Sequence, residues 1–370
     1  MRSFTTLRTI SFFTSFLIIF AATAVSQTPT PTPAIAEEDQ IVKVDSRLVV
    51  VPVSVTNSAG EPVLGLKAED FRLSEENRPQ TIDSVGNADI VPLEIALLID
   101  VSGSVNPLFE FEKKAAAQFL QTVMKDEDRA TIFLISDVPT PILQRESAAL
   151  AAERLKGVMP AGKSTAFYDA TLAAARYLRQ NAPARSLRVI VAITDGEDNY
   201  SEMVRNAESS TWKDVEVDKL TTAMLNRQAS SSDPAHRVAQ TRVSRELQDA
   251  DTVFYVINPA GTSIKLNKIS MRAQTGMEKF ANETGGTFFL PAFVPTTTKY
   301  LHQNASNMKK NEATLDRIFK QLANDLRSQY LIQYYSESEF PLNKFVKLSV
   351  DLRNPSDRRV RARQGYYVKN

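Results

Sequence analysis

The sequence predicts an α/β protein with a doubly wound, mainly parallel sheet and a second, smaller domain of the β-sandwich type. Two short apolar runs, at residues 95–99 and 188–194, have the length and composition of strands buried on both faces. Strand-like runs and helical stripes alternate around them, which is typical of a parallel sheet covered by helices. The flanking segments, 40–90 and 329–370, show the two-residue period of strands instead.

Residues 1–26 have the features of a secretory signal peptide. Arg2 and Arg8 precede an apolar stretch from Ile10 to Val25, and Ala24-Val25-Ser26 fits cleavage near Ser26. A retained anchor is the alternative, but it needs about 20 apolar residues. The chain has no cysteine, which excludes a lipid-modified cysteine and disulfides. We therefore expect a bacterial protein that is secreted or periplasmic, without stable membrane insertion after cleavage.

The composition is that of an ordinary globular protein. The chain has 44 basic and 43 acidic residues, and removal of Arg2 and Arg8 leaves a formal charge of −1. This balance gives no electrostatic reason to expect nucleic acid or anionic lipid as a partner. Residues 27–39 contain Thr-Pro repeats, which predict an extended linker between the signal peptide and the folded part.

The N-terminal segment 40–90 contains a predicted strand with four valines on one face: Val49, Val51, Val53 and Val55. Further strand-like runs are separated by turn residues: 63–66, 71–74 and 80–85. The C-terminal segment contains three more predicted strands: 330–335, 346–352 and 360–367. Neither segment is long enough to bury a core alone. We therefore expect both to form one domain, with two separate additions to the α/β domain as the alternative.

The run Arg358, Arg359, Arg361 and Arg363 allows two interpretations. Four arginines close together are able to bind an anion, and they are also common on the solvated edge of a strand. The edge strand is the simpler interpretation.

The α/β domain is expected at 91–328. Predicted strands lie at 130–135, 188–194, 252–257 and 287–289, with a possible short antiparallel edge at 141–144. Apolar residues at helical spacing predict helices around Phe119, around Leu172 and from Leu315 to Leu326, and Gly285 is expected to end another helix.

Five side chains with hard oxygen atoms follow the predicted strand ends or lie in the loop between them: Asp100, Ser102, Ser104, Thr165 and Asp195. The carboxyl ends of parallel strands meet at one edge of a sheet, and hard cations such as Mg²⁺ prefer oxygen ligands. The first loop alone is better explained as a polar turn in which Asp100 and Ser102 accept backbone hydrogen bonds. Three such loops in order predict a metal site.

On these residues the chain resembles the von Willebrand factor type A family over about residues 91–327. The five residues match, one by one, the metal-ion-dependent adhesion site (MIDAS) of that family. The resemblance implies one Mg²⁺ or Mn²⁺, held by the hydroxyls of Ser102, Ser104 and Thr165, with Asp100 and Asp195 binding directly or through water. It also implies an open position that an acidic side chain of a protein partner fills. Exported bacterial proteins with type A domains have a similar arrangement of flanking β segments.

An insertion at about 200–245 separates this chain from the simplest members of the family. Loops of this length are often functional or disordered, and residues 230–234 are expected to break its structure. Trp212 is the only tryptophan and has two interpretations: an anchor for a partner, or a residue that fixes the insertion to its own domain.

An enzyme is the alternative to a binding module. The two histidines, His236 and His302, lie in polar stretches that predict exposure, and neither a Gly-x-Ser-x-Gly motif nor a cysteine nucleophile is present. Metal-assisted hydrolysis would need a base, for which Glu197 and Asp198 are candidates. We expect a metal-dependent adhesion or assembly module and not an enzyme, with a scaffold stabilised by metal as a further alternative.

Overall fold

The computed structural model describes residues 47–102, 107–162, 164–211, 222–259, 261, 267–296 and 298–369. The predicted signal peptide and linker, the start of the N-terminal β segment and Trp212 lie outside these residues. Among the helices that are described, none is both long and apolar enough to cross a membrane.

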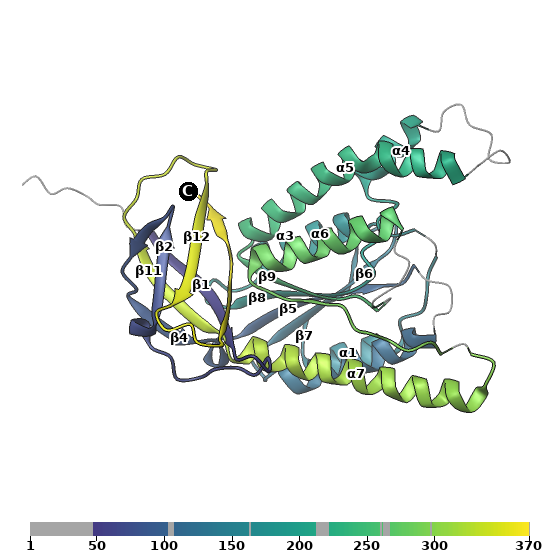
Figure 1. Ribbon diagram of the computed structural model, residues 1–370, viewed down its shortest axis with the longest axis horizontal. Coiled ribbons are helices and arrows are strands. Elements are labelled where there is room, and N and C mark those ends of the chain that lie inside the picture. The colour runs from purple at the N-terminus through teal and green to yellow at the C-terminus, as the bar shows by residue number, and fades with distance from the viewer. Residues whose placement is uncertain are drawn as a thin grey trace, which may run out of the picture. The chain divides into compact units, whose positions relative to one another are not determined.

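A six-stranded sheet with the order β10-β9-β8-β5-β6-β7 forms the centre of the α/β region (Figure 1). Its strands are β5 (Leu93–Asp100), β6 (Arg129–Ile135), β7 (Pro141–Glu146), β8 (Leu187–Ile193), β9 (Thr252–Ile257) and β10 (Phe288–Phe289). All neighbours are parallel except β7, which pairs antiparallel with β6 at the edge. This confirms the predicted mainly parallel sheet and its antiparallel edge.

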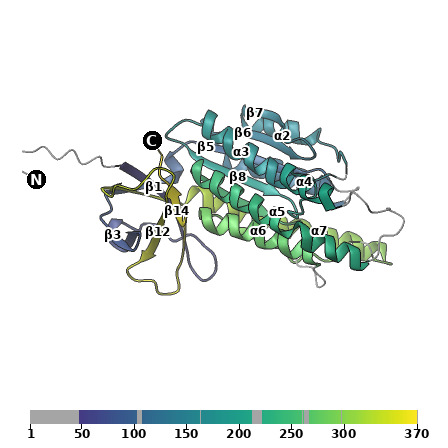
Figure 2. The same cartoon turned by 90° about the horizontal axis from the view of Figure 1, so that it is seen from above.

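Helices cover both faces of this sheet, which confirms the doubly wound fold (Figures 1 and 2). One face packs against α1 (Pro107–Val123), α2 (Ala148–Lys156) and α7 (Leu301–Arg327). The other packs against α3 (Phe167–Asn181), α5 (Thr222–Asp249) and α6 (Lys268–Thr284), and α4 (Glu202–Thr211) contacts α5. Successive residues of β5 enter the two cores alternately, because side chains alternate across a strand. A strand covered on both faces is therefore apolar throughout.

Two four-stranded antiparallel sheets combine strands from both ends of the described chain, in the orders β13-β1-β11-β4 and β14-β12-β2-β3. The strands are β1 (Arg47–Thr56), β2 (Phe71–Glu75), β3 (Arg78–Gln80), β4 (Ser84–Asn87), β11 (Tyr330–Ser336), β12 (Phe345–Leu352), β13 (Arg359–Ala362) and β14 (Gly365–Tyr367). Apolar residues of both sheets share one core. We propose that 40–90 and 329–370 form one domain, with the α/β domain between them in the sequence.

Three details of the β segments differ from the prediction. Residues 63–66 form no strand. Val63 donates its N–H to the carbonyl of Val55, and its own carbonyl accepts a hydrogen bond from the hydroxyl of Tyr330. Pro79 lies in β3 and not in a turn, because β3 is an edge strand in which a missing N–H is tolerated. The single strand expected at 360–367 divides into β13 and β14, which belong to different sheets.

The described residues of the insertion at 200–245 lie mostly in α4 and α5, and the break predicted at 230–234 is wrong. Helix α5 continues through Pro234, although proline removes a backbone hydrogen bond. The later turns of α5 are buried in the core that they share with α3 and α6, so packing overrides the local preference. An ion pair of 2.7 Å between Asp233 and Arg272 of α6 adds to this attachment.

Candidate functional site

Asp100 connects the first and third predicted loops. It ends β5, and its Oδ1 accepts hydrogen bonds from the backbone N–H of Ser102 at 3.0 Å and from the Ser102 hydroxyl at 2.5 Å. Its Oδ2 accepts a hydrogen bond from the hydroxyl of Thr194 at 2.6 Å. Thr194 follows β8, which is the neighbour of β5 in the sheet. Adjacent parallel strands therefore bring the two loops together at their carboxyl ends.

Asp195 follows Thr194 at the same edge. Its Oδ1 accepts a hydrogen bond of 3.0 Å from the N–H of Glu197. Burial raises the pKa of Asp195 to about 6, the hydrogen bond from Glu197 opposes the rise, and repulsion from Asp100 adds to it. Two carboxylates thus lie close enough to destabilise each other.

Thr165, in the second loop, is buried and attached to the third loop by its backbone. Its N–H donates to Oδ1 of Asn199 at 2.9 Å, and its carbonyl accepts from the N–H groups of Asn199 and Tyr200 at 3.0 and 3.1 Å. The hydroxyl of Thr165 has no hydrogen-bond partner among the described residues. That leaves it available as a ligand.

The structure brings together three of the five predicted ligands, Asp100, Ser102 and Asp195. It joins the loop of Thr165 to the loop of Asp195 through Asn199. The fifth, Ser104, lies outside the described residues. Within the described part of the chain, no group of three or more histidines, cysteines or acids is arranged to hold a metal. The predicted ligand set is not such a group, because it has only two carboxylates and its other three ligands are hydroxyls.

Glu112 is a buried acid near Asp100 and Asp195 that was not singled out from the sequence. Its residue is 5% exposed within α1, and its Oε1 has no hydrogen-bond partner among the described residues. Burial raises the pKa of Glu112 to about 7, and repulsion from Asp100 and Asp195 contributes to the rise. The sequence contained a signal for this burial. Glu112 lies four residues before Ala116 and seven before Phe119, so it falls on the apolar stripe of the predicted helix.

The charges at this edge fit a divalent cation. Neither Asp195 nor Glu112 forms an ion pair with a lysine or arginine among the described residues, and burial and repulsion from neighbouring carboxylates raise the pKa of both. Buried carboxylates are usually paired with a cation or coordinate a metal. The hydroxyls of Ser102 and Thr165 supply the neutral oxygen ligands that Mg²⁺ and Mn²⁺ accept.

Glu197 and Asp198, the candidate bases, hold neighbouring segments. Oε1 of Glu197 accepts a hydrogen bond of 2.6 Å from the hydroxyl of Ser270. Oδ2 of Asp198 accepts from the N–H of Tyr168 at 2.8 Å and from the hydroxyl of Ser201 at 2.5 Å. Burial raises the pKa of Asp198 to about 6 despite these hydrogen bonds. Asp198 thereby caps α3, which has no capping side chain of its own.

The expected exposure of His236 is wrong, since its residue is 1% exposed. Its Nδ1 forms a hydrogen bond of 3.2 Å with the hydroxyl of Tyr168, which connects α5 to α3. Burial, followed by repulsion from Arg272, lowers the pKa of His236 to about 3. It is therefore a neutral packing residue. His302 is exposed, as the sequence predicts.

Residues 95–197 match the family model of the von Willebrand factor type A domain. The resemblance predicted from the three loops is therefore confirmed for this stretch, which contains all five predicted ligands. No curated protein matches the chain.

Several solved structures are similar at low sequence identity. An aerotolerance-related membrane protein from Bacteroides fragilis is 18% identical, with 61% of this chain and 99% of that chain covered and a TM-score of 0.34. Proximal thread matrix protein 1 from the mussel byssus, with a zinc-occupied MIDAS motif, is 13% identical over 68% of this chain and 49% of that chain, with a TM-score of 0.37. A von Willebrand factor type A structure from Catenulispora acidiphila is 12% identical over 86% of this chain and 72% of that chain, with a TM-score of 0.39.

Proposed function

We propose that this chain is an exported binding module in which Asp100, Ser102, Ser104, Thr165 and Asp195 hold one Mg²⁺ or Mn²⁺. The observation that supports this most is the hydrogen bonding that joins three oxygen-bearing loops at one sheet edge. Asp100 bonds to Thr194, and Thr165 bonds to Asn199. A bound cation would supply electrostatic attraction for an outside anion at this edge.

The ligand of the cation is proposed to be an acidic side chain of a protein partner. The hydroxyls that the chain contributes are neutral, so the cation keeps affinity for a further carboxylate. Carboxylate oxygen is also the side-chain ligand that both Mg²⁺ and Mn²⁺ prefer. The chain's own part in binding is to hold the cation and its loops in place before the partner arrives.

Binding is favoured over catalysis by the contacts of the two candidate bases. Glu197 holds Ser270 and Asp198 caps α3, so both carboxylates have structural roles. A scaffold in which the cation only stabilises the loops is the second candidate. It is supported by the hydrogen bonds that already join the loops through Asn199.

The test is chemical cross-linking of the purified chain to its partner in Mg²⁺ and in EDTA. Thr165→Val removes one ligand hydroxyl and retains the backbone bonds to Asn199, and Thr122→Val makes the same change on an exposed helix face. We expect the parent and Thr122→Val to capture the same partner in Mg²⁺ only, and Thr165→Val to lose it while its unfolding temperature without metal stays unchanged.

The partner's acid is then identified by replacing each carboxylate near the cross-link with its amide, and one replacement should abolish capture. A partner bound equally well in EDTA would contradict the proposal. Stabilisation by Mg²⁺ with no metal-dependent partner would favour the scaffold.

A further inference from the structure

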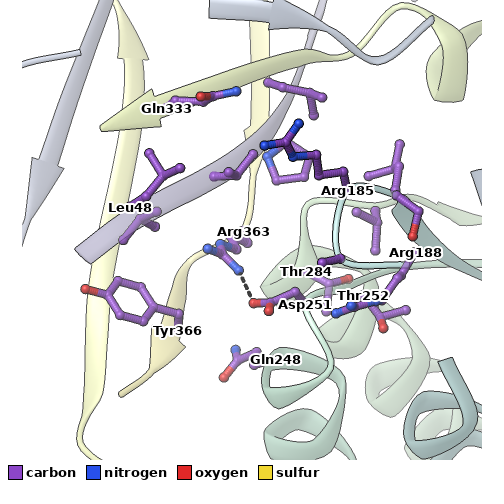
Figure 3. A pocket seen from close by; sticks show the side chains of 18 of the residues that line it. Leu48, Arg185, Arg188, Gln248, Asp251, Thr252, Thr284, Gln333, Arg363 and Tyr366 are labelled. Carbon is purple, nitrogen blue, oxygen red and sulfur yellow. Dashed lines mark hydrogen bonds and ion pairs between the residues drawn. The ribbon is translucent and has the colours of Figure 1, made fainter. Parts of the chain in front are cut away.

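A cavity of about 750 Å³ lies at the opposite end of the central sheet from the predicted metal ligands. Its walls include the first residues of β8 and β9, whereas Asp100 and Asp195 follow the ends of strands. The other wall is formed by β1 together with Leu331, Tyr366, Tyr367 and Lys369. In Figure 3, Arg363 lies between Tyr366 on one side and Asp251 on the other, and Arg185 lies on the side of Arg188 and Thr252.

The wall that β1 contributes is apolar. Leu48 and Val50 line the cavity and are 48% and 37% exposed, so water contacts these side chains. Pro52, Val91 and Leu331 extend the same wall. Large apolar side chains left exposed in a concave surface are typical of ligand sites.

The charged residues that line the cavity are mostly cationic. Five are basic, namely Arg47, Arg185, Arg188, Arg363 and Lys369, and one is an acid, Asp251. Asp251 accepts hydrogen bonds from Arg363 at 2.7 Å and from Lys369 at 3.0 Å. Burial alone would raise the pKa of Asp251, but these two cations hold it below its usual value. The one acid in the lining is therefore already shared by two cations.

Three arginines in the lining have no carboxylate partner among the described residues. Arg47 donates to the carbonyl of Lys369 at 3.2 Å, and Arg188 donates to the carbonyl of Ala250 at 3.1 Å. Arg185 is exposed and makes no hydrogen bond or ion pair within the described part of the chain. The buried Nε atoms of Arg188 and Arg363 also have no hydrogen-bond partner there.

From this arrangement we propose that the cavity binds a small amphiphilic anion, with a carboxylate or phosphate group at the arginines and an apolar body against Leu48, Val50 and Pro52. Guanidinium groups match the geometry of both oxyanions, and an oxyanion would accept from donors that have no partner among the described residues. The cavity volume lies within the range of about 300 to 1,000 Å³ that is typical of small-molecule sites. This ligand is independent of the proposed metal function.

The experiment is calorimetric titration of the purified chain with octanoate, octyl phosphate, octanol and octyltrimethylammonium. We expect one saturable site for octanoate or octyl phosphate, at least tenfold weaker binding of octanol, and no binding of the cationic amphiphile. Preference between the two anions identifies the headgroup. Equal affinity for octanol and both anions, or no saturable binding of either anion, would overturn the proposal.

Two matched variants locate the site. Arg185→Gln should weaken anion binding at least tenfold at an unchanged unfolding temperature, because Arg185 has no partner to lose among the described residues. Arg317→Gln, an exposed arginine on α7 without a partner among the described residues, should bind as the parent does. An undiminished affinity in Arg185→Gln would contradict the proposal. EDTA and Thr165→Val should leave anion binding unchanged, so this test fails or succeeds independently of the metal site.

Discussion

The two ends of the central sheet bury acids in opposite ways. At the carboxyl ends, burial and repulsion between carboxylates raise the pKa values of Asp195 and Glu112, and neither residue forms an ion pair among the described residues. At the amino ends, Asp128 is fully buried and forms an ion pair with Arg327 of α7. A buried acid therefore does not define a site, because the protein supplies the counter-ion at one end and leaves the charge uncompensated at the other.

The environment of Asp128 is complete without any ligand. Its Oδ1 accepts from the N–H of Leu93 at 2.7 Å, and its Oδ2 accepts from the N–H of Lys125 at 2.6 Å and from the guanidinium of Arg327. The residue thus connects β5, the turn before β6 and the end of α7. The comparison predicts that removal of Asp128 destabilises the fold, whereas removal of the charge of Glu112 or Asp195 stabilises the metal-free protein.

The largest effect is expected for Asp128→Ala. Removing one partner of a buried ion pair leaves Arg327 uncompensated and should lower the free energy of unfolding by about 3 to 5 kcal/mol. Urea unfolding measures the change, with exposed Asp126→Ala as a control that should stay within about 0.5 kcal/mol of the parent. A loss for Asp128→Ala below about 1 kcal/mol would mean that the amino end is not held by this pair.

Glu112→Gln should have the opposite sign. The folded pKa of about 7 lies above the ordinary value of 4.5, so the folded state binds more protons than the unfolded state between these values. The contribution of Glu112 to stability is therefore full below about pH 4.5 and is lost as the pH rises through about 7. Without metal, Glu112→Gln should stabilise the fold by on the order of 2 to 3 kcal/mol at about pH 8, and should have little effect at about pH 4.

Unfolding free energies of the metal-free proteins at the two pH values measure this difference. Exposed Glu127→Gln is the matched control and should be neutral at both. If Glu112→Gln destabilises the protein at high and low pH alike, the carboxyl of Glu112 is satisfied by the fold, and the contrast between the two ends is wrong.

Asn199→Ala should have the smallest effect on the fold. Its side chain accepts from the N–H of Thr165 at 2.9 Å, so the change should cost about 1 to 2 kcal/mol in the free energy of unfolding. The same change should weaken Mg²⁺ binding, because Thr165 is held less firmly. Exposed Asn324→Ala serves as the control. Unchanged Mg²⁺ affinity in Asn199→Ala would show that the second loop is positioned by other contacts.

The sequence predicts what depends on local pattern. The run at 95–99 and the acid after it are adjacent in the chain, so both the strand and the place of Asp100 could be predicted. The roles of Glu112 and His236 depend on which helix faces which, and no local pattern fixes that. The partnership of Asp128 with Arg327 joins residues about 200 positions apart, so it could only be seen in the structure.

Helix α2 is a case in which a local signal was present and not used. Ser147 precedes it and its hydroxyl accepts from the N–H of Leu150, and Gly157 follows the last turn. For Pro234 the local signal was used and was wrong, because buried residues on the later turns of α5 outweigh the local cost of proline. Capping residues thus set the ends of α2, whereas tertiary packing keeps α5 continuous through its proline.

The most direct test of the central claim is calorimetric titration of the purified chain with MgCl₂ near neutral pH. We expect one saturable site, and at least tenfold weaker binding in Asp195→Asn, which should at the same time be more stable than the parent without metal. The exposed variant Glu127→Gln should bind Mg²⁺ as the parent does. Because the pKa of Asp195 is about 6, binding should weaken as the pH falls below that value. No saturable binding of Mg²⁺ or Mn²⁺, or equal affinity in Asp195→Asn, would contradict a metal centre at this edge of the sheet.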